Sequence, residues 1–189
     1  MGEAGSRPAG GAGTAILTVG HSTRTAEELA GLLRQHGVER LVDVRSAPGS
    51  RRMPHFARAA LEAWLPEAGI AYLHMPELGG LRRPRPNSVN GGWRNDGFRG
   101  YADYMQQPEF WSALEQLRKL ASERRTAIMC AEAVPWRCHR SLISDALTAR
   151  GVRVLHITGR GEPSQHRLTP FASVVEGHIT YPPPDTLPL

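Results

Sequence analysis

The side chains best suited to chemistry gather between Thr126 and Gly151. Within eleven positions this stretch carries two thiols, a carboxylate, an imidazole and two guanidinium groups: Cys130, Glu132, Arg137, Cys138, His139 and Arg140. The dipole of a helix stabilises a thiolate at the helix N-terminus, and neighbouring arginines add to this effect. We therefore expect Cys138 to be a nucleophile, His139 a general base or proton donor, and Glu132 an orienting group or acid.

The same residues allow a non-catalytic alternative. A helix N-terminus beside Arg137 and Arg140 can bind a phosphate or a carboxylate while the thiol takes no part. Cys130 lies in a short apolar run, Ala127–Cys130. We expect it to pack inside a strand as a small hydrophobic residue, which leaves Glu132 and the predicted helix start at Cys138 as the reactive part.

Strand and helix signals alternate along the chain. Short β-rich runs predict strands at 15–19, 41–44, 71–75, 127–130 and 152–157, with an edge strand at 177–181. Amphipathic patterns predict helices at 25–36, 57–68, 109–124 and 138–151, the second kinked or ended by Pro66. Closely spaced strands and helices form parallel βαβ units. We predict an α/β fold in three layers, a mostly parallel sheet of about five strands with helices on both faces.

Polar residues follow several of these predicted strands. His21 and Ser22 come after the first strand, Asp43 and Arg45 end the second, and two glycines follow the third. The carboxyl ends of parallel strands share one edge of a sheet, where ligands bind. We therefore predict one cleft in which His21 and Asp43 join the catalytic residues. The residues predicted to bind an anionic substrate there are Ser22, Arg45, Arg137, Arg140, Gly79 and Gly80.

These candidates also have structural alternatives. Asp43 can cap a loop, and Gly79 and Gly80 can permit a tight turn. His156, in the last predicted strand, can be a hydrogen-bonded core histidine. The five arginines of 81–100 can form a solvated surface.

The charge is basic in an unusual way. The net charge is +5, and Lys119 is the only lysine among 23 basic residues. Arginine binds phosphate in a bidentate manner and stacks on bases, so an anionic small molecule or a nucleic acid is the expected partner. The long segment 81–100 adds Trp93 to its arginines and is predicted to be a functional or disordered loop. A codon preference for arginine is the alternative explanation.

The length of 189 residues suits one domain. We predict a flexible leader at 1–14, a single α/β domain at 15–181 and a proline-rich tail at 182–189. The sequence has no apolar run of the ~18–20 residues that span a bilayer, and no secretory signal, so no membrane partner is expected. Two cysteines indicate a reducing, cytoplasmic location. No cofactor and no metal are predicted, and the oligomeric state is left open.

Four short patterns match only in part. A phosphatase loop needs an arginine six positions after its cysteine, whereas Arg137 lies seven after Cys130. Asp43-Val44-Arg45 is similar to the entry strand of rhodanese domains, but the expected loop does not follow. Cys138-His139-Arg140 is similar to the core of alkylguanine-DNA alkyltransferases, with Arg137 in place of their proline. A zinc site from Cys130, Cys138, His139 and His21 would have an unusual spacing.

A match over about Ile16 to Phe171 is more specific. Its elements, in order, are Gly20-His21-Ser22, Asp43-Val44-Arg45 with Pro48 and Ser50, Leu78-Gly79-Gly80, Tyr101 with Met105, Met129 to Glu132, Cys138-His139-Arg140, and His156-Ile157. With these elements the sequence resembles the domain of unknown function 488 family. The resemblance implies an α/β fold and no particular reaction. Tyr101 joins the predicted substrate-binding residues on this basis.

Three functions remain open. The first is an enzyme acting on a nucleotide or a nucleic-acid base, by glycosidic cleavage or by transfer to Cys138, with the arginines and Trp93 holding phosphates and stacking a base. The second is a thiol-dependent enzyme for a small anionic metabolite. The third is a module that binds an anion or a nucleic acid without turnover.

Overall fold

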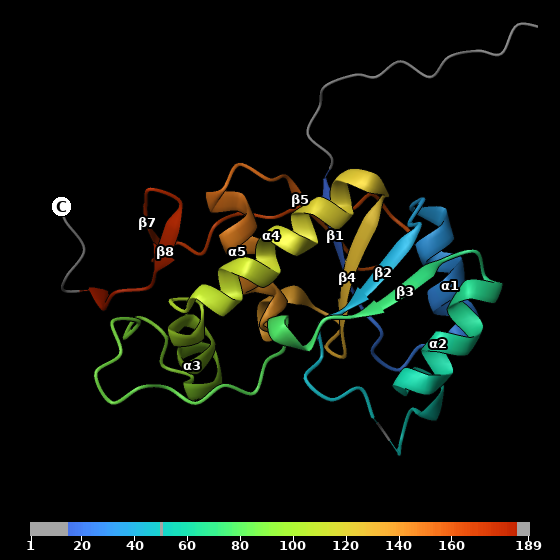
Figure 1. The fold of residues 1–189 in the computed structure, drawn as a ribbon, viewed down its shortest axis with the longest axis horizontal. Helices are drawn as coiled ribbons and strands as arrows, with labels where there is room; N and C mark the ends of the chain where they lie inside the picture. Colours follow the sequence, from blue (N-terminus) through green and yellow to red (C-terminus); the bar gives the residue numbers. More distant parts are fainter. Residues whose placement is uncertain (1–14, 50, 185–189) are drawn as a thin grey trace, which may run out of the picture.

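A six-stranded sheet forms the centre of the molecule in the computed structural model, which describes residues 15–49 and 51–184 (Figure 1). Its strands, in spatial order, are β3 (Ala71–His74), β2 (Arg40–Asp43), β4 (Thr126–Cys130), β1 (Ile16–Gly20), β5 (Val154–Ile157) and β6 (Ser164–Gln165). The first five are parallel, and β6 pairs with β5 in the antiparallel sense. The predicted mostly parallel α/β fold is confirmed.

Helices cover both faces of this sheet, as predicted (Figure 1). The helices are α1 (Ala26–Gln35), α2 (Arg58–Glu67), α3 (Asp96–Tyr104), α4 (Pro108–Glu123) and α5 (Arg140–Ala149). One hydrophobic cluster joins α1 and α2 to Ala127 and Met129 of β4, and the other joins α3, α4 and α5 to Ile128 and Cys130. Alternate residues of a strand face opposite sides, so neighbouring positions belong to different clusters. Within the described residues, no helix is long and apolar enough to cross a membrane.

Local signals set the ends of the helices. Thr25 and Glu28 form a capping box at the start of α1, because each side chain bonds the backbone N–H of the other. Pro66 lies inside α2, which continues to Glu67. The expected helix start at Cys138 was wrong by two residues. Cys138 is extended, at the end of the 3₁₀ turn η3 (Pro135–Arg137), and α5 begins at Arg140.

The segment 81–100, predicted as a loop, contains the start of α3. Asn95 caps this helix by accepting a hydrogen bond from the N–H of Phe98. The buried carboxylate of Asp103 in α3 then holds the preceding loop, since it accepts bonds from Arg85 N (2.8 Å), Ser88 Oγ (2.6 Å) and Asn90 Nδ2 (2.8 Å). Hydrogen bonds, rather than hydrophobic periodicity, order this loop.

The C-terminal segment forms a separate hairpin. The strands β7 (Ser173–Val175) and β8 (His178–Thr180) pair with each other and do not extend the main sheet. The predicted strand at 177–181 is therefore present but lies outside the main sheet. The predicted leader, 1–14, and residues 185–189 of the predicted tail lie outside the described residues.

Candidate active site

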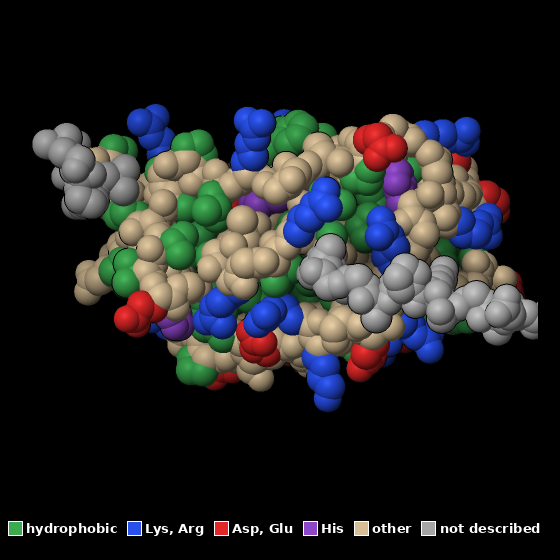
Figure 2. Space-filling view, turned by 90° about the horizontal axis from the view of Figure 1, so that it is seen from above, with side chains coloured by type: hydrophobic (Ala, Val, Ile, Leu, Met, Phe, Trp, Pro, Cys, Tyr) green, Lys and Arg blue, Asp and Glu red, His purple; other side chains and the backbone are tan. Residues whose placement is uncertain are grey.

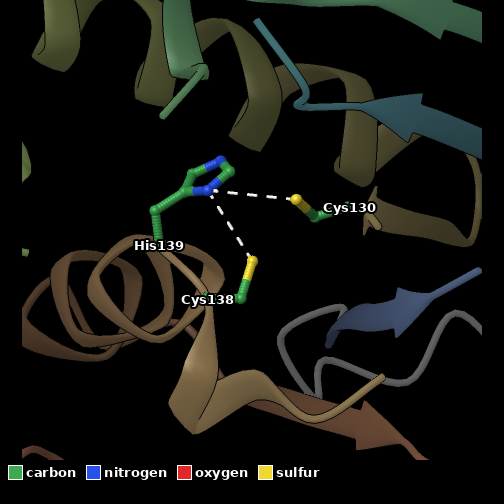
Figure 3. Close-up of side chains that lie close together, drawn as sticks. All are labelled: Cys130, Cys138 and His139. Carbon is green, nitrogen blue, oxygen red and sulfur yellow. Dashed lines mark hydrogen bonds between the residues drawn. The ribbon is translucent and has the colours of Figure 1, made fainter. Parts of the chain in front are cut away.

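Two thiols and one imidazole converge where β4 leads into α5 (Figure 3). The Nδ1 atom of His139 lies 3.6 Å from Cys138 Sγ and 4.0 Å from Cys130 Sγ. All three atoms lie within 4.8 Å of one another, and both cysteines are free. Cys130 comes from the end of β4, and the other two residues come from the turn before α5, so the seven residues 131–137 return the chain to the same point.

The imidazole of His139 is oriented by the backbone directly after β2. Its Nε2 lies 2.9 Å from the carbonyl oxygen of Val44, which can only accept, so Nε2 carries the proton. The lone pair of the neutral ring is then on Nδ1, which points at the two sulfurs. A histidine ligand of a metal ion commonly has this arrangement, with its second N–H donated to a carbonyl.

The spacing of the three atoms suits a zinc ion. Zn–S bonds of about 2.3 Å and Zn–N bonds of about 2.0 Å give tetrahedral edges of about 3.5–3.8 Å. The sulfur–nitrogen distances of 3.6 and 4.0 Å are close to these values. Three protein ligands of this kind leave the fourth position of the tetrahedron for a water molecule or a substrate.

The pKa values of the two thiols are shifted in opposite directions. The pKa of Cys138 is lowered, first by a hydrogen bond from Cys130 and also by the charge of Arg140. The pKa of Cys130 is raised well above its usual range by the same bond and by burial. Cys138 is therefore the more acidic thiol of the pair, and the cause is this cluster rather than a position inside the helix.

A pocket of about 270 Å³ opens above the cluster. Its first wall is the loop between β4 and α5, with Cys130, Glu132, Arg137, Cys138 and His139. Its second wall comes from the segment before and within α3, with Gly80, Leu81, Asn95, Gly97 and Phe98. The pocket thus has the two thiols and the imidazole at its base and the aromatic ring of Phe98 in one wall. The polar side chains of Glu132, Arg137 and Asn95 can contact a ligand there.

Gly20 at the end of β1 allows this pocket wall to form. A Cβ atom at Gly20 would lie 1.7 Å from the carbonyl oxygen of Glu132. We expect Gly20→Ala to lower the free energy of unfolding by about 1–3 kcal/mol, because the loop must move away. Urea unfolding measures this, with Gly31→Ala as the control. Gly31 lies within α1 with nothing near its Cβ position, so alanine there should raise stability by about 0.5–1 kcal/mol. Equal effects at the two positions would contradict the packing argument.

Three predicted site residues lie on the other face of the sheet. Arg45 pairs with Asp43 through Nε (2.9 Å) and NH2 (2.6 Å), and its NH1 lies 3.2 Å from His21 Nε2. All three are buried, and the ring of His21 packs on Phe56, which belongs to the α1 and α2 cluster. The prediction of one shared cleft is therefore wrong for these residues. The strands end at one edge, but Asp43 and Val44 point to opposite faces.

Four further predicted binding residues have structural contacts. Tyr101 is fully buried, lies 5.1 Å from the His139 ring and donates its hydroxyl to Leu78 O at 2.8 Å. Gly79 packs on Ser46, and the N–H of Ser22 bonds to Ala131 O at 2.9 Å. Arg140 is fully buried and donates to the carbonyl of Glu132. Of the predicted anion-binding residues, Arg137 and Gly80 line the pocket.

The aromatic and basic loop is less free than the sequence suggested. Trp93 stacks on Phe98 at 4.8 Å and also contacts Phe171 and Tyr181, so its faces are occupied by protein. Arg82 lies over the ring of Tyr104 at 3.8 Å. The predicted stacking of a base on Trp93 is therefore not available in this structure.

Three residues of the site were not predicted. Cys130 was assigned to strand packing, yet its sulfur lies on the pocket floor. Its position at the last residue of β4 was the available signal, since strand ends carry functional groups in parallel sheets. Asn95 and Phe98 lie in the segment predicted as a loop, and no sequence pattern placed them opposite Glu132.

The fold and the pocket define a parallel α/β protein with a Cys-Cys-His cluster at the carboxyl edge of its sheet. The family model described as domain of unknown function DUF488 matches residues 25–147, about two thirds of the chain. The chain belongs to this family. Searches of curated proteins and of solved structures gave no significant match.

Proposed function

We propose that the protein is a metal-dependent hydrolase that acts on a nucleobase or a nucleotide. The observation that carries this proposal is the convergence of Cys130 Sγ, Cys138 Sγ and His139 Nδ1 at the floor of a pocket that Glu132 also lines. Zinc in such a site activates water as a nucleophile at neutral pH.

Glu132 supplies the proton transfer in this proposal. Its side chain is exposed in the pocket wall, and its backbone is held by Arg140, so the carboxylate can face a substrate without serving as a ligand. Zinc deaminases of nucleobases combine a His/Cys/Cys site with a glutamate of this kind, which acts as general acid and base. The arrangement therefore favours water attack on a ring carbon with Glu132 moving the proton.

The walls of the pocket support a small planar substrate with a negative charge. At about 270 Å³ it is just below the range of about 300–1,000 Å³ for pockets that hold drug-sized ligands. Phe98 offers an apolar ring, Asn95 offers hydrogen bonds, and Arg137 offers a charge for a phosphate. Figure 2 shows basic side chains spread among acidic ones over the face seen there.

The first test is metal content. Purified protein should carry about one zinc per chain, measured by mass spectrometry of the metal, and the Co²⁺-substituted protein should show sulfur-to-cobalt charge-transfer absorption. Cys138→Ser and His139→Ala should lose both signals, while Ser112→Ala, far from the cluster, should keep them. Absence of stoichiometric binding by the unaltered protein would remove the metal from the proposal.

The second test is turnover by the zinc-loaded protein. Nucleobases, nucleotides and short single-stranded oligonucleotides are incubated with it, and ammonia release and base products are measured. We expect turnover of at least one class, and a loss of about 10²–10⁴-fold in Glu132→Gln with zinc content unchanged. Zinc binding without turnover of any substrate in the panel would indicate a structural site and contradict the hydrolase.

A second candidate function is a thiol-dependent enzyme for a small anion. The lowered pKa of Cys138 favours it, because hydrogen bonds and the charge of Arg140 stabilise its thiolate. This candidate expects metal-free protein in which iodoacetamide alkylates Cys138 faster than Cys130 and faster than a free thiol at pH 6. An ordinary alkylation rate in chelator-treated protein would count against it.

A further inference from the structure

A second set of buried titratable groups lies behind the pocket. A continuous series of contacts runs from Asp145 Oδ1 to His166 Nε2 (2.8 Å), from His166 Nδ1 to His156 Nε2 (2.9 Å), and from His156 Nδ1 to Thr18 Oγ1 (2.7 Å). Arg140 NH1 donates to the same Thr18 oxygen at 3.4 Å. The series starts and ends on α5, since Asp145 and Arg140 both belong to that helix. We call it the Asp145–Arg140 chain.

The hydrogen bonds of this chain all run in the same direction, from Arg140 toward Asp145. The carboxylate of Asp145 is fully buried and already accepts bonds from the N–H (3.0 Å) and hydroxyl (2.7 Å) of Thr169 and from the hydroxyl of Tyr181 (2.8 Å). A carboxylate only accepts, so His166 donates from Nε2, and with its ring neutral its Nδ1 accepts from His156. A tautomer change at either histidine would break two bonds of the chain.

The same logic fixes the hydroxyl of Thr18. His156 donates from Nε2, so its Nδ1 accepts the proton of Thr18 Oγ1. The lone pairs of that oxygen are then directed to Arg140, which can only donate. Asp145 therefore determines, through His166 and His156, how the hydroxyl of Thr18 beside Arg140 is oriented.

Arg140 connects the Asp145–Arg140 chain to the pocket wall. Its side chain is fully buried, NH2 donates to the carbonyl of Glu132, and no carboxylate among residues 15–49 and 51–184 pairs with it. The carbonyl belongs to the loop 131–137, which joins Cys130 to Cys138 and carries the Glu132 side chain. The Arg140 guanidinium thus bridges the Asp145–Arg140 chain and the loop that shapes the cluster.

We propose that Thr18, His156, His166 and Asp145 are positioning residues that fix Arg140, and through it the loop 131–137 with Glu132 and Cys138. The proposal rests on the proposed function in so far as that loop carries the reactive groups. An apolar residue in place of Thr18 would leave Arg140 NH1 without its acceptor, and the loop would lose its anchor. None of these four residues lines the pocket above the cluster.

The matched pair Thr18→Val and Thr18→Ser tests this role. Valine keeps the shape of threonine but removes the hydroxyl, whereas serine keeps the hydroxyl. We expect Thr18→Val to raise amide hydrogen exchange in residues 131–137 above any global change, and to weaken Co²⁺ or Zn²⁺ binding by about 10–100-fold. Thr18→Ser should restore both values to near those of the unaltered protein. Unchanged exchange in 131–137 for the folded valine variant would overturn the proposal, whether or not the protein binds metal.

A second variant uses the pocket beside the histidines. His156 and His166 line a separate pocket of about 400 Å³ together with Trp136 and Thr169, so His166→Gly leaves a hole that imidazole can enter. We expect faster exchange in 131–137 in this variant and recovery on adding imidazole. The unaltered protein with imidazole reports any direct binding to the metal, and His178→Gly is the control at an exposed position. Failure of imidazole to slow the exchange would contradict the chain, while absence of metal binding in the unaltered protein would contradict only the proposed function.

Discussion

Replacing Asp43 by alanine is expected to lower the free energy of unfolding by about 3–5 kcal/mol. The carboxylate has no exposed surface and accepts bonds from Arg45 Nε and NH2 and from the hydroxyl of Tyr72 at 2.9 Å. Its removal leaves the buried guanidinium of Arg45 without a counter-charge, and a buried unpaired charge is far more costly than a lost surface contact. Urea unfolding at pH 7 followed by circular dichroism measures the change.

The matched control is an exposed pair on α2. Arg58 and Glu62 form an ion pair at 2.7 Å with about half of each side chain exposed, 57% and 47%. Glu62→Ala should therefore change stability by no more than about 0.5 kcal/mol. A loss of less than about 1 kcal/mol in Asp43→Ala would show that Arg45 finds another partner, and would contradict a structural role for the pair.

Stability should also fall steeply in mild acid. The pKa of His21 and that of His156 are both lowered from 6.5 to about 4, mainly by burial, and the charge of Arg45 adds to the effect at His21. An unfolded histidine takes up a proton near pH 6.5, whereas these two remain neutral in the folded state until about pH 4. Their contribution is therefore complete above pH 6.5 and is lost as the pH falls toward 4. We expect a loss of about 3 kcal/mol for each histidine between pH 6.5 and 4, since both rings are buried.

Urea unfolding at pH 7, 6, 5 and 4.5 measures this slope. His178 is exposed, and His178→Gln should leave the slope unchanged. His21→Gln replaces the imidazole by a neutral amide. The free energy of unfolding of this variant should depend less steeply on pH, even though the variant is less stable at pH 7. Constant stability from pH 7 to 4.5 would contradict the burial of both neutral rings.

Local signals in the sequence predicted most of the regular elements. The capping pattern at Thr25 placed the start of α1 within one residue, and the apolar run ending at Cys130 placed β4. These elements are specified by neighbours in the sequence. The segment 81–100 was harder to predict, because Gly97 and Gly100 weaken the helical pattern of α3. A Cβ at Gly100 would lie 2.3 Å from Arg82 O, so the close contact with Arg82 requires a glycine at this position. The same glycine weakens the helical signal in the sequence.

The candidate site was predicted in part for a related reason. Glu132, Cys138 and His139 are close in sequence, and the structure keeps them together at the pocket. Local patterns could not decide the face on which Asp43 lies, because a shift of one residue along a strand reverses the face. The pairing of His139 with Val44 O, 95 positions away, was equally outside the reach of local patterns.

The contact between His139 and Val44 has a consequence for the order in which the protein is made. Every residue of the Cys-Cys-His pocket, and the carbonyl that orients His139, belongs to the segment from Val44 to His139. The Asp145–Arg140 chain also needs β5 and His166, which leave the ribosome later. Domains fold from the N-terminal side during synthesis. A nascent chain can therefore gather its two sulfurs and its imidazole, the ligands of the metal that we propose, before the residues that fix Arg140 have been translated.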